Sequence, residues 1–361
     1  MGETLRRRTL LLAVPATAVP LAAAGAAALS IAHDSTRDEE TSATRPGLLR
    51  DMLPKPHQLA AALDLRPGGP SAAAALRDVI TALHAADRDD IRTSLALGSA
   101  LFTARETRPR QLTAMPSFPG DVLEPRRTHG DLLVQITGPS PKSVTSAWTR
   151  ISAALPAWTV RWQLEGARPD NQLTDGQALT RNPFHFTEGF GNPNSTRALE
   201  ERALVRADQG EPAWTVGGSY EVVRIIRLAT EMWDNDSVAA QEQVIGRRRD
   251  GRWLDGTSIQ EQPNFAADPS GKLTPLDAHV RRAAPDRRNP PPLVRRSYSY
   301  DRGYGDQGLI FSCFQRDLAH GFEAVQKRLA GEAMAKYVLT TGGGYFFVPP
   351  PGDDWLLQAF E

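Results

Sequence analysis

Segments with the hydrophobic pattern of helices and of strands alternate along this chain, and they do so twice. Apolar residues spaced about 3.6 apart predict helices, whereas alternation or a short apolar run predicts strands. The first half gives, in chain order, helix Ser71–Ala86, strand Leu95–Phe102, strand Asp131–Thr137, helix Ser143–Leu155 and strand Trp158–Leu164.

The second half also alternates between strand and helix patterns. It gives strand Ser219–Arg227, helix Ser237–Ile245, strand Gly308–Phe314, helix Gly321–Tyr337 and strand Gly344–Val348. Strand–helix–strand order repeated in this way predicts an α+β fold with two related halves. The boundary falls best in the Pro/Asn/Gly-rich stretch 181–197, so we assign 51–185 and 186–361 to the two halves.

The N-terminus has the plan of an export signal. Arg6, Arg7 and Arg8 precede an apolar run from Leu10 to Ile31, and small residues there offer cleavage sites. The arginines resemble a twin-arginine (Tat) signal, so residues 1–31 are expected to engage the Tat export machinery. An uncleaved membrane anchor is the alternative. Residues 32–50 are polar, lack periodicity and are expected to form a linker.

Composition argues against several classes of function and site. The 361 residues carry 42 Lys+Arg against 42 Asp+Glu, a balance that argues against non-specific binding of nucleic acid. A single cysteine, Cys313, excludes an internal disulfide framework and a cysteine-based zinc cluster. It lies in an apolar strand pattern and is expected to be a buried small hydrophobe. Gly342–Gly344 opens no predicted helix, so it is not a phosphate-binding loop.

Several strings, in shared order and spacing, resemble the dye-decolourising (DyP-type) heme peroxidases. They are Ser94–Phe102, His129–Gln135, Pro212–Arg224, Trp233–Asp234, Gln241–Gln243, Gly246–Arg247, Leu276–Arg281, Arg295–Tyr300, Val325–Leu329 and Gly342–Phe347. The resemblance is to a Tat-exported branch associated with iron uptake. It implies two ferredoxin-like halves with antiparallel sheets, as in dimeric α+β barrels, and heme b in the C-terminal half.

The resemblance implies that His279, in LDAHVRRA, is the axial ligand of the heme iron. Glu332 is a candidate for the carboxylate that orients its ring; the alternative is a solvated helix residue. Arg295 matches the arginine on the distal face, where a fixed positive charge stabilises negative charge as the O–O bond breaks. Its neighbour Arg296 is expected to face the opposite way, as a surface arginine.

The distal acid is where this chain departs from the family. The family motif is Gly-x-x-Asp-Gly, with Asn-Pro two residues later, whereas this chain has His185 for the leading Gly and Glu188 for the Asp. Glu188 is expected to accept a proton from bound peroxide and return it to the leaving oxygen. The alternative is that Glu188 only holds the loop. His185 would assist, occupy space or ligate iron from the wrong side.

Other residues are assigned to the heme pocket by their position. Arg224 is expected to bind a heme propionate, and Asn192 either caps the loop or meets a propionate. Leu309 and Phe311, at i and i+2 of a strand, are expected to line the distal pocket unless they are simply core. Candidates for electron relay to bulky donors, each with packing as the alternative, are Trp214, Trp233, Trp253, Tyr298 and Tyr304.

The resemblance implies a peroxidase that uses hydrogen peroxide to oxidise organic donors, phenolic or dye-like, by one-electron steps. One alternative is an exported heme-binding or iron-delivery protein, deferrochelatase-like, with weak peroxidase activity. The other is a specialised biosynthetic heme oxidase. Folds of this kind often self-associate, so a homo-oligomer is a further expectation.

Overall fold

The computed structural model describes residues 45–361 except 52, 89, 169–180, 189, 259–260, 262 and 287–289. Its first half runs β1 (His57–Leu65), α2 (Ala72–Ala86), β2 (Arg92–Gly98), β3 (Leu132–Gly138), α3 (Pro141–Ala153) and β4 (Trp158–Ala167). The strands pair antiparallel in the order β2-β3-β1-β4. This β-α-β-β-α-β unit is ferredoxin-like.

The second half repeats this arrangement with longer connections. Its strands are β5 (Ser219–Leu228), β6 (Val294–Arg295), β7 (Tyr298–Asp301), β8 (Gln307–Gln315) and β9 (Val338–Val348). The antiparallel order is β9-β5-β8-β7, with β6 also beside β8. Its helices are α4 (Thr196–Ala203), α5 (Thr230–Asp234), α6 (Val238–Ile245), α7 (His279–Ala283), α8 (Ala324–Leu329) and α9 (Asp354–Phe360). The predicted α+β class is confirmed.

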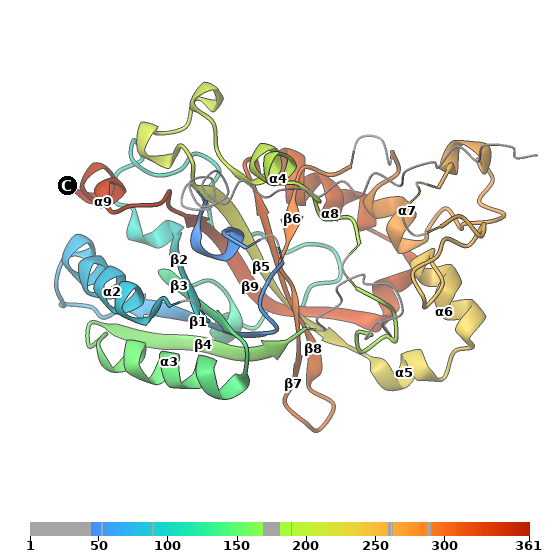
Figure 1. Cartoon of the computed structure of the whole chain (residues 1–361), viewed down its shortest axis with the longest axis horizontal. Coiled ribbons are helices and arrows are strands. Elements are labelled where there is room, and N and C mark those ends of the chain that lie inside the picture. The colour runs from blue at the N-terminus through green and yellow to red at the C-terminus, as the bar shows by residue number, and fades with distance from the viewer. Residues whose placement is uncertain are drawn as a thin grey trace, which may run out of the picture.

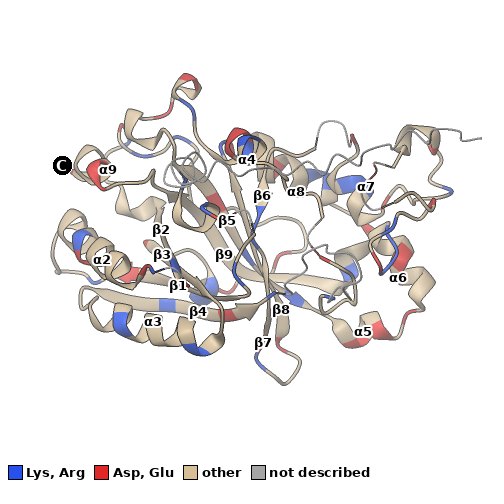
Figure 2. Cartoon of the chain, in the orientation of Figure 1, with Lys and Arg blue, Asp and Glu red and all other residues tan. Residues whose placement is uncertain are grey.

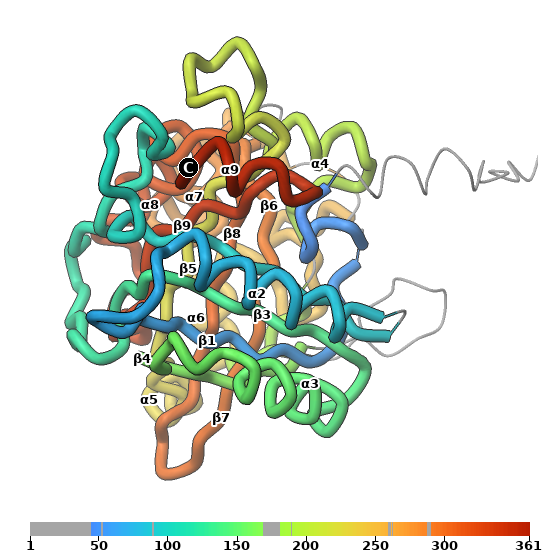
Figure 3. The backbone as a smooth tube through the Cα atoms, turned by 90° about the vertical axis from the view of Figure 1, so that its left-hand side faces the viewer, coloured from blue at the N-terminus to red at the C-terminus, as the bar shows by residue number. Residues whose placement is uncertain are grey.

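Two short seams join the halves into a barrel-like sheet. β2 pairs with β9 at Leu97 and Gly98, and β4 pairs with β7 only at Ala167. Figure 1 places α2 and α3 at one end of the molecule and α5, α6 and α7 at the other. Figure 3 shows α2 and α3 facing the viewer, in front of β1 and β3. One cluster of buried side chains contains residues from both halves and so fills the space inside the sheet: Ala60, Ala62, Ala96, Leu133, Val223, Ile225, Ile310 and Phe346.

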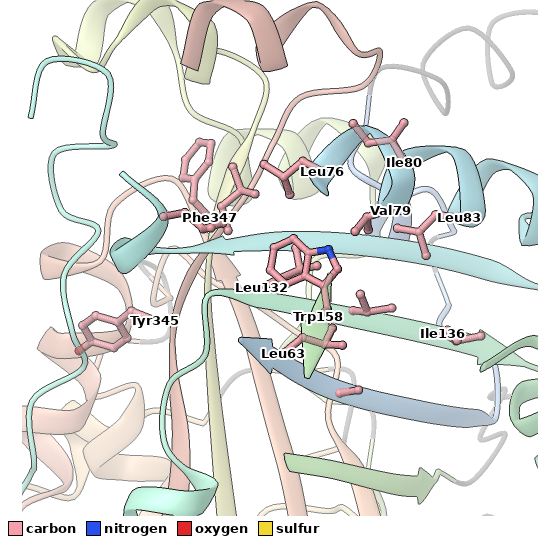
Figure 4. Packing of buried hydrophobic residues seen from close by; sticks show 14 of the residues in the cluster. Leu63, Leu76, Val79, Ile80, Leu83, Leu132, Ile136, Trp158, Tyr345 and Phe347 are labelled. Carbon is pink, nitrogen blue, oxygen red and sulfur yellow. The ribbon is translucent and has the colours of Figure 1, made fainter. Parts of the chain in front are cut away.

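Helices α2 and α3 form because their ends are capped and one face of each is apolar. The Ser71 hydroxyl accepts from Ala74 N, and Ser140 and Ser143 form a reciprocal capping box at the start of α3. Leu76, Val79 and Leu83 of α2 face the sheet. Figure 4 shows them packed beside Leu132, Ile136 and Trp158, which makes this the main core of the first half.

Three predicted elements differ from the structure. The strand expected over Leu95–Phe102 ends at Gly98 and gives way to a helical turn. The helix expected over Gly321–Tyr337 is three segments, and Gly331, with φ of 75°, marks the break before the turn Ala333–Tyr337. The strand expected over Gly344–Val348 begins earlier, at Val338, so Gly342–Gly344 lies inside β9, where a Cβ on Gly343 would meet Val223 O at 1.9 Å. This triplet therefore serves close strand packing.

Figure 2 shows Lys and Arg interspersed with Asp and Glu along the described helices and loops. No helix in the described ranges is both long and apolar enough to cross a bilayer. The expected signal and most of the expected linker lie outside the described residues. The division at 185/186 stays a prediction.

Candidate functional site

His279 opens helix α7, and a carboxylate holds its ring. Its Nδ1 lies 2.6 Å from Oε2 of Glu332, so the ring N–H donates to the carboxylate. The side chain of Glu332 is 7 % exposed and that of His279 is 25 % exposed. Because Nδ1 carries the proton, Nε2 keeps the lone pair that a metal ion would take.

The main chain fixes this pair as well. Ala333 N donates to Asp277 O over 3.1 Å, which ties the residues beside Glu332 to those beside His279. Arg328 adds two bonds from α8, donating to Arg282 O and to Ala283 O at the end of α7. The imidazole and its carboxylate therefore belong to one rigid frame.

Arg295 lies on β6 and is tied to the loop that follows Glu188. Asn192 Oδ1 accepts from Arg295 N over 2.8 Å, and Asn192 Nδ2 donates to Arg295 O over 2.9 Å. The Arg295 guanidinium also donates to Phe190 O. Both amide atoms of Asn192 thus bond the main chain, which favours the loop-holding alternative for this residue.

Glu188 and Arg295 share one electrostatic environment. Burial raises the pKa of Glu188, while Arg168, a hydrogen bond with Asn182, and Arg295 act to lower it. Burial lowers the pKa of Arg295, opposed by Glu188. An arginine stays charged under such a shift, so the pair consists of a fixed cation and a carboxyl whose proton is held more tightly than usual.

Leu309 and Phe311 lie on the same face of β8, two residues apart, and both are half-buried. Arg295 is the register partner of Cys313 and therefore shares this face. The ring of Phe311 is 6.3 Å from that of Phe322, and Leu309 packs against a cluster that includes Trp233 and Tyr337. The sheet thus presents a partly uncovered apolar surface beside Arg295.

His185 contacts the carboxylate of Asp234, at the end of α5. Its Nε2 lies 2.7 Å from Asp234 Oδ1, and both side chains are about half exposed, at 43 % and 52 %. Its φ is 67°, in the left-handed region that glycine adopts without strain. The family motif Gly-x-x-Asp-Gly has glycine at the position of His185, and glycine adopts this backbone conformation without strain.

Arg224 lies deeper, in a buried ion pair. Its side chain is 4 % exposed and that of Asp121 is 2 % exposed, with Nη1–Oδ2 at 3.1 Å and Nη2–Oδ1 at 2.5 Å. The rings of Phe118 and Phe322 lie 5.1 and 5.8 Å from the guanidinium carbon. Both terminal nitrogens bond within the protein, and propionate binding by Arg224 stays a prediction.

Arg296 corrects one expectation. It faces away from Arg295 as predicted, yet it is only 2 % exposed. It donates to Asp51 O in the first half, and burial lowers its pKa to about 10. The alternation of the strand holds, but the opposite face is the interior of the barrel, so Arg296 is not a surface arginine.

The aromatic candidates divide by burial. Trp214, Trp233, Trp253 and Tyr298 are at most 5 % exposed, whereas Tyr304 is fully exposed in the turn between β7 and β8. Cys313 is fully buried, as expected, and burial raises the pKa of its thiol.

Sequence reasoning missed Asp121, Asn182 and Arg168. Asp121 lies in the long connection between β2 and β3, and Asn182 and Arg168 lie outside every predicted element. Asp121 contacts Arg224, which lies far along the chain, whereas Asn182 bonds within its own turn to Phe184 and Phe186. Neither kind of contact follows the hydrophobic pattern of a helix or a strand.

The fold and site together define a duplicated ferredoxin-like protein with a carboxylate-oriented histidine in its second half. The chain belongs to the Dyp-type peroxidase family: the N-terminal family model matches residues 20–168 and the C-terminal model residues 179–353. The deferrochelatase of Escherichia coli K12 is 38 % identical over 270 residues, 70 % of this chain and 64 % of that protein. The match thus spans less than two thirds of that relative's length.

Solved structures give the same family. Ferric DtpA from Streptomyces lividans is 30 % identical with a TM-score of 0.74, covering 83 % of this chain and 90 % of that one. A DyP-type peroxidase from Streptomyces coelicolor is 30 % identical with a TM-score of 0.75, covering 85 % and 93 %.

Proposed function

We propose that this protein is a heme b peroxidase that reduces hydrogen peroxide and oxidises organic donors one electron at a time. The observation that carries the proposal is the 2.6 Å contact between His279 Nδ1 and Glu332 Oε2. A carboxylate there fixes the tautomer and raises the basicity of the ligating nitrogen, which favours a ferric iron over a ferrous one.

The surrounding residues fit a heme. The half-buried side chains of Leu309 and Phe311 supply an apolar sheet face that a flat macrocycle would cover. Arg295 supplies a fixed positive charge beside that face, and Glu188 supplies a buried carboxyl whose pKa that charge acts to lower. His279 would hold the iron, while Arg295, Glu188, Leu309 and Phe311 would form the peroxide side.

Heme, when bound, supplies the redox-active iron through which peroxide takes two electrons and each donor gives one. Glu188 would accept a proton from one oxygen of the peroxide and return it to the other oxygen, which would leave as water. Arg295 stabilises the negative charge that builds on the departing oxygen. Overall, one peroxide and two donor molecules that each lose a hydrogen atom give two waters and two donor radicals.

Phenols and dyes are the donor class that we propose, by extension from the family. The second candidate function is heme-binding or iron delivery, which the name of the deferrochelatase relatives favours. The added methylene of Glu188 is consistent with it, because a misplacement of about 1 Å can cost on the order of 10²-fold in rate.

We also propose export. The support is the Arg6–Arg8 cluster followed by the apolar run to Ile31, a sequence pattern typical of a Tat substrate. Export of the full chain, compared with a chain in which Arg7 and Arg8 are both replaced by Lys, tests the assignment. Equal export of the two chains would contradict it.

A stopped-flow experiment tests the peroxidase proposal. The heme-loaded protein is mixed with stoichiometric peroxide and the ferric Soret band is followed. A peroxidase loses this band rapidly, and Glu188→Gln slows the loss by about 10²-fold or more, whereas the exposed control Glu201→Gln does not. A band that persists or only bleaches slowly in the unsubstituted protein would make iron delivery the better account.

A further inference from the structure

The segment 182–188 carries Glu188 and folds as a tight turn. Asn182 O accepts from His185 N over 2.7 Å, and Asn182 N donates to Phe186 O over 2.9 Å. Asn182 Oδ1 also accepts from Phe184 N and Phe186 N, each over 3.0 Å. The same Asn182 side chain hydrogen-bonds Glu188. The position of the Glu188 carboxyl therefore depends on how this turn is held.

Helix α5 holds the turn from outside. The ring of Phe184 stacks on Trp233 with centroids 4.4 Å apart, and Trp233 Nε1 donates to Phe184 O over 3.0 Å. The next residue of the turn, His185, meets the next residue of the helix, Asp234, with Nε2 and Oδ1 2.7 Å apart. Two neighbouring contacts thus attach the turn to the end of α5.

The backbone conformation at position 185 does not explain why a histidine is found there. A φ of 67° is uncommon for a residue other than glycine and persists only where the surroundings impose it. The pair with Asp234 is also half exposed, so it contributes little to overall stability. A strained and exposed histidine that keeps a short contact to a carboxylate fits a local role better than a role in folding.

We propose that His185 and Asp234 form a latch that positions the Glu188 carboxyl for proton transfer. Both are positioning residues, since they act through the turn and through Asn182. The inference rests on the proposed function, because it needs Glu188 to move the peroxide proton. It assigns to His185 a role distinct from ligating iron or filling the pocket.

The test uses the heme-loaded full chain and the peroxide-dependent loss of the ferric Soret band. Asp234→Ala and His185→Gly each break the contact, and glycine also suits the positive φ. Each is expected to lower the second-order rate constant about tenfold, with heme content and the resting spectrum unchanged. Asp234→Asn keeps an acceptor oxygen and is expected to stay within about twofold of the unsubstituted protein.

A double-substitution cycle separates positioning from general damage. In a Glu188→Gln background, Asp234→Ala is expected to have no further effect, because the carboxyl that the latch positions is gone. The matched control is Asp353→Ala, which removes an exposed carboxylate 3.8 Å from His84 at a distance from this turn.

The outcomes distinguish the two claims. If Glu188→Gln slows the reaction but Asp234→Ala does not, or if Asp234→Ala has the same effect in both backgrounds, the latch is wrong and the proposed function stands. If Glu188→Gln leaves the rate unchanged, the proton role of Glu188 fails, and the latch fails with it.

Discussion

Glu332 lies 53 residues after His279, yet its Oε2 is 2.6 Å from the imidazole Nδ1. The carboxylate of Glu332 is nearly buried, whereas the ring of His279 is partly exposed. Water therefore reaches the imidazole but hardly reaches the carboxylate. Because a buried charge is screened little by water, the Glu332 carboxylate would act strongly on the His279 nitrogen that we propose as the iron ligand.

Glu332→Gln is expected to raise the heme reduction potential and to slow the peroxide step by about 10- to 100-fold, because the amide keeps the hydrogen bond but removes the negative charge. A spectroelectrochemical titration and the stopped-flow rate measure the two effects. Glu332→Asp keeps the charge and should fall between the two proteins. An unchanged potential in Glu332→Gln would contradict the assigned role.

Arg295→Lys is expected to slow the peroxide step by about 10²-fold. Lysine keeps the charge but loses the fork that donates to Phe190 O and that faces Glu188. The matched control is Arg197→Lys in the exposed pair with Glu201. A rate equal to that of the control would show that the charge alone suffices at this position.

Asp121→Asn is expected to destabilise the protein by about 3–5 kcal/mol, because it leaves the buried Arg224 cation without its counter-charge. Urea unfolding measures the change. Asp64→Asn breaks an ion pair of similar type, with Arg161 at 2.8 Å, but a more exposed one, and should cost at most about 1 kcal/mol. Similar costs for the two variants would refute the distinction.

Glu221 predicts a pH dependence of stability. It is fully buried inside the barrel, where Ser312 Oγ donates to it over 2.5 Å, and burial raises its pKa from 4.5 to about 7. The folded chain holds this proton to a higher pH than the unfolded chain does. The stability is therefore complete below about pH 4.5 and falls as the pH rises through about 7, by up to about 3 kcal/mol.

Glu221→Gln should abolish that loss, since the amide does not ionise, and should make the protein more stable than the unsubstituted chain at about pH 8. Urea unfolding of both proteins at about pH 5 and pH 8 measures it. Parallel pH profiles would mean that other groups govern the dependence.

The order of helices and strands was predictable because amphipathic periodicity is local. Strand β1 escaped prediction for a physical reason: Gln58 to Leu63 are all buried, so the alternation that marks a half-buried strand is absent, and the alanine-rich run resembles a helix equally well. The break at Gly331 was missed because the flanking residues keep helical spacing across it.

The site was predictable only where a residue type carries the chemistry. His279, Arg295 and Glu188 could be proposed from their strings, and Glu332 could be suggested as a partner. The supporting contacts could not be predicted from the sequence. Asp121 contacts Arg224, and His185 contacts Asp234, only because tertiary packing brings them together. Arg296 was misjudged for the same reason, since strand alternation does not tell which side of a sheet is solvent.

The narrow seams between the halves have a consequence for assembly of the protein. β4 meets β7 at one register pair and β2 meets β9 at two, and the connection between β2 and β3 adds backbone bonds from Val122, Glu124 and His129 to β9. Asp121 of the first half also neutralises Arg224 of the second. The two halves thus pack against each other as two subunits of a dimer would, with apolar side chains and one buried ion pair across the interface. We therefore expect two separately synthesised fragments to associate through this interface, because each fragment alone would expose apolar surface and leave one buried charge without its partner.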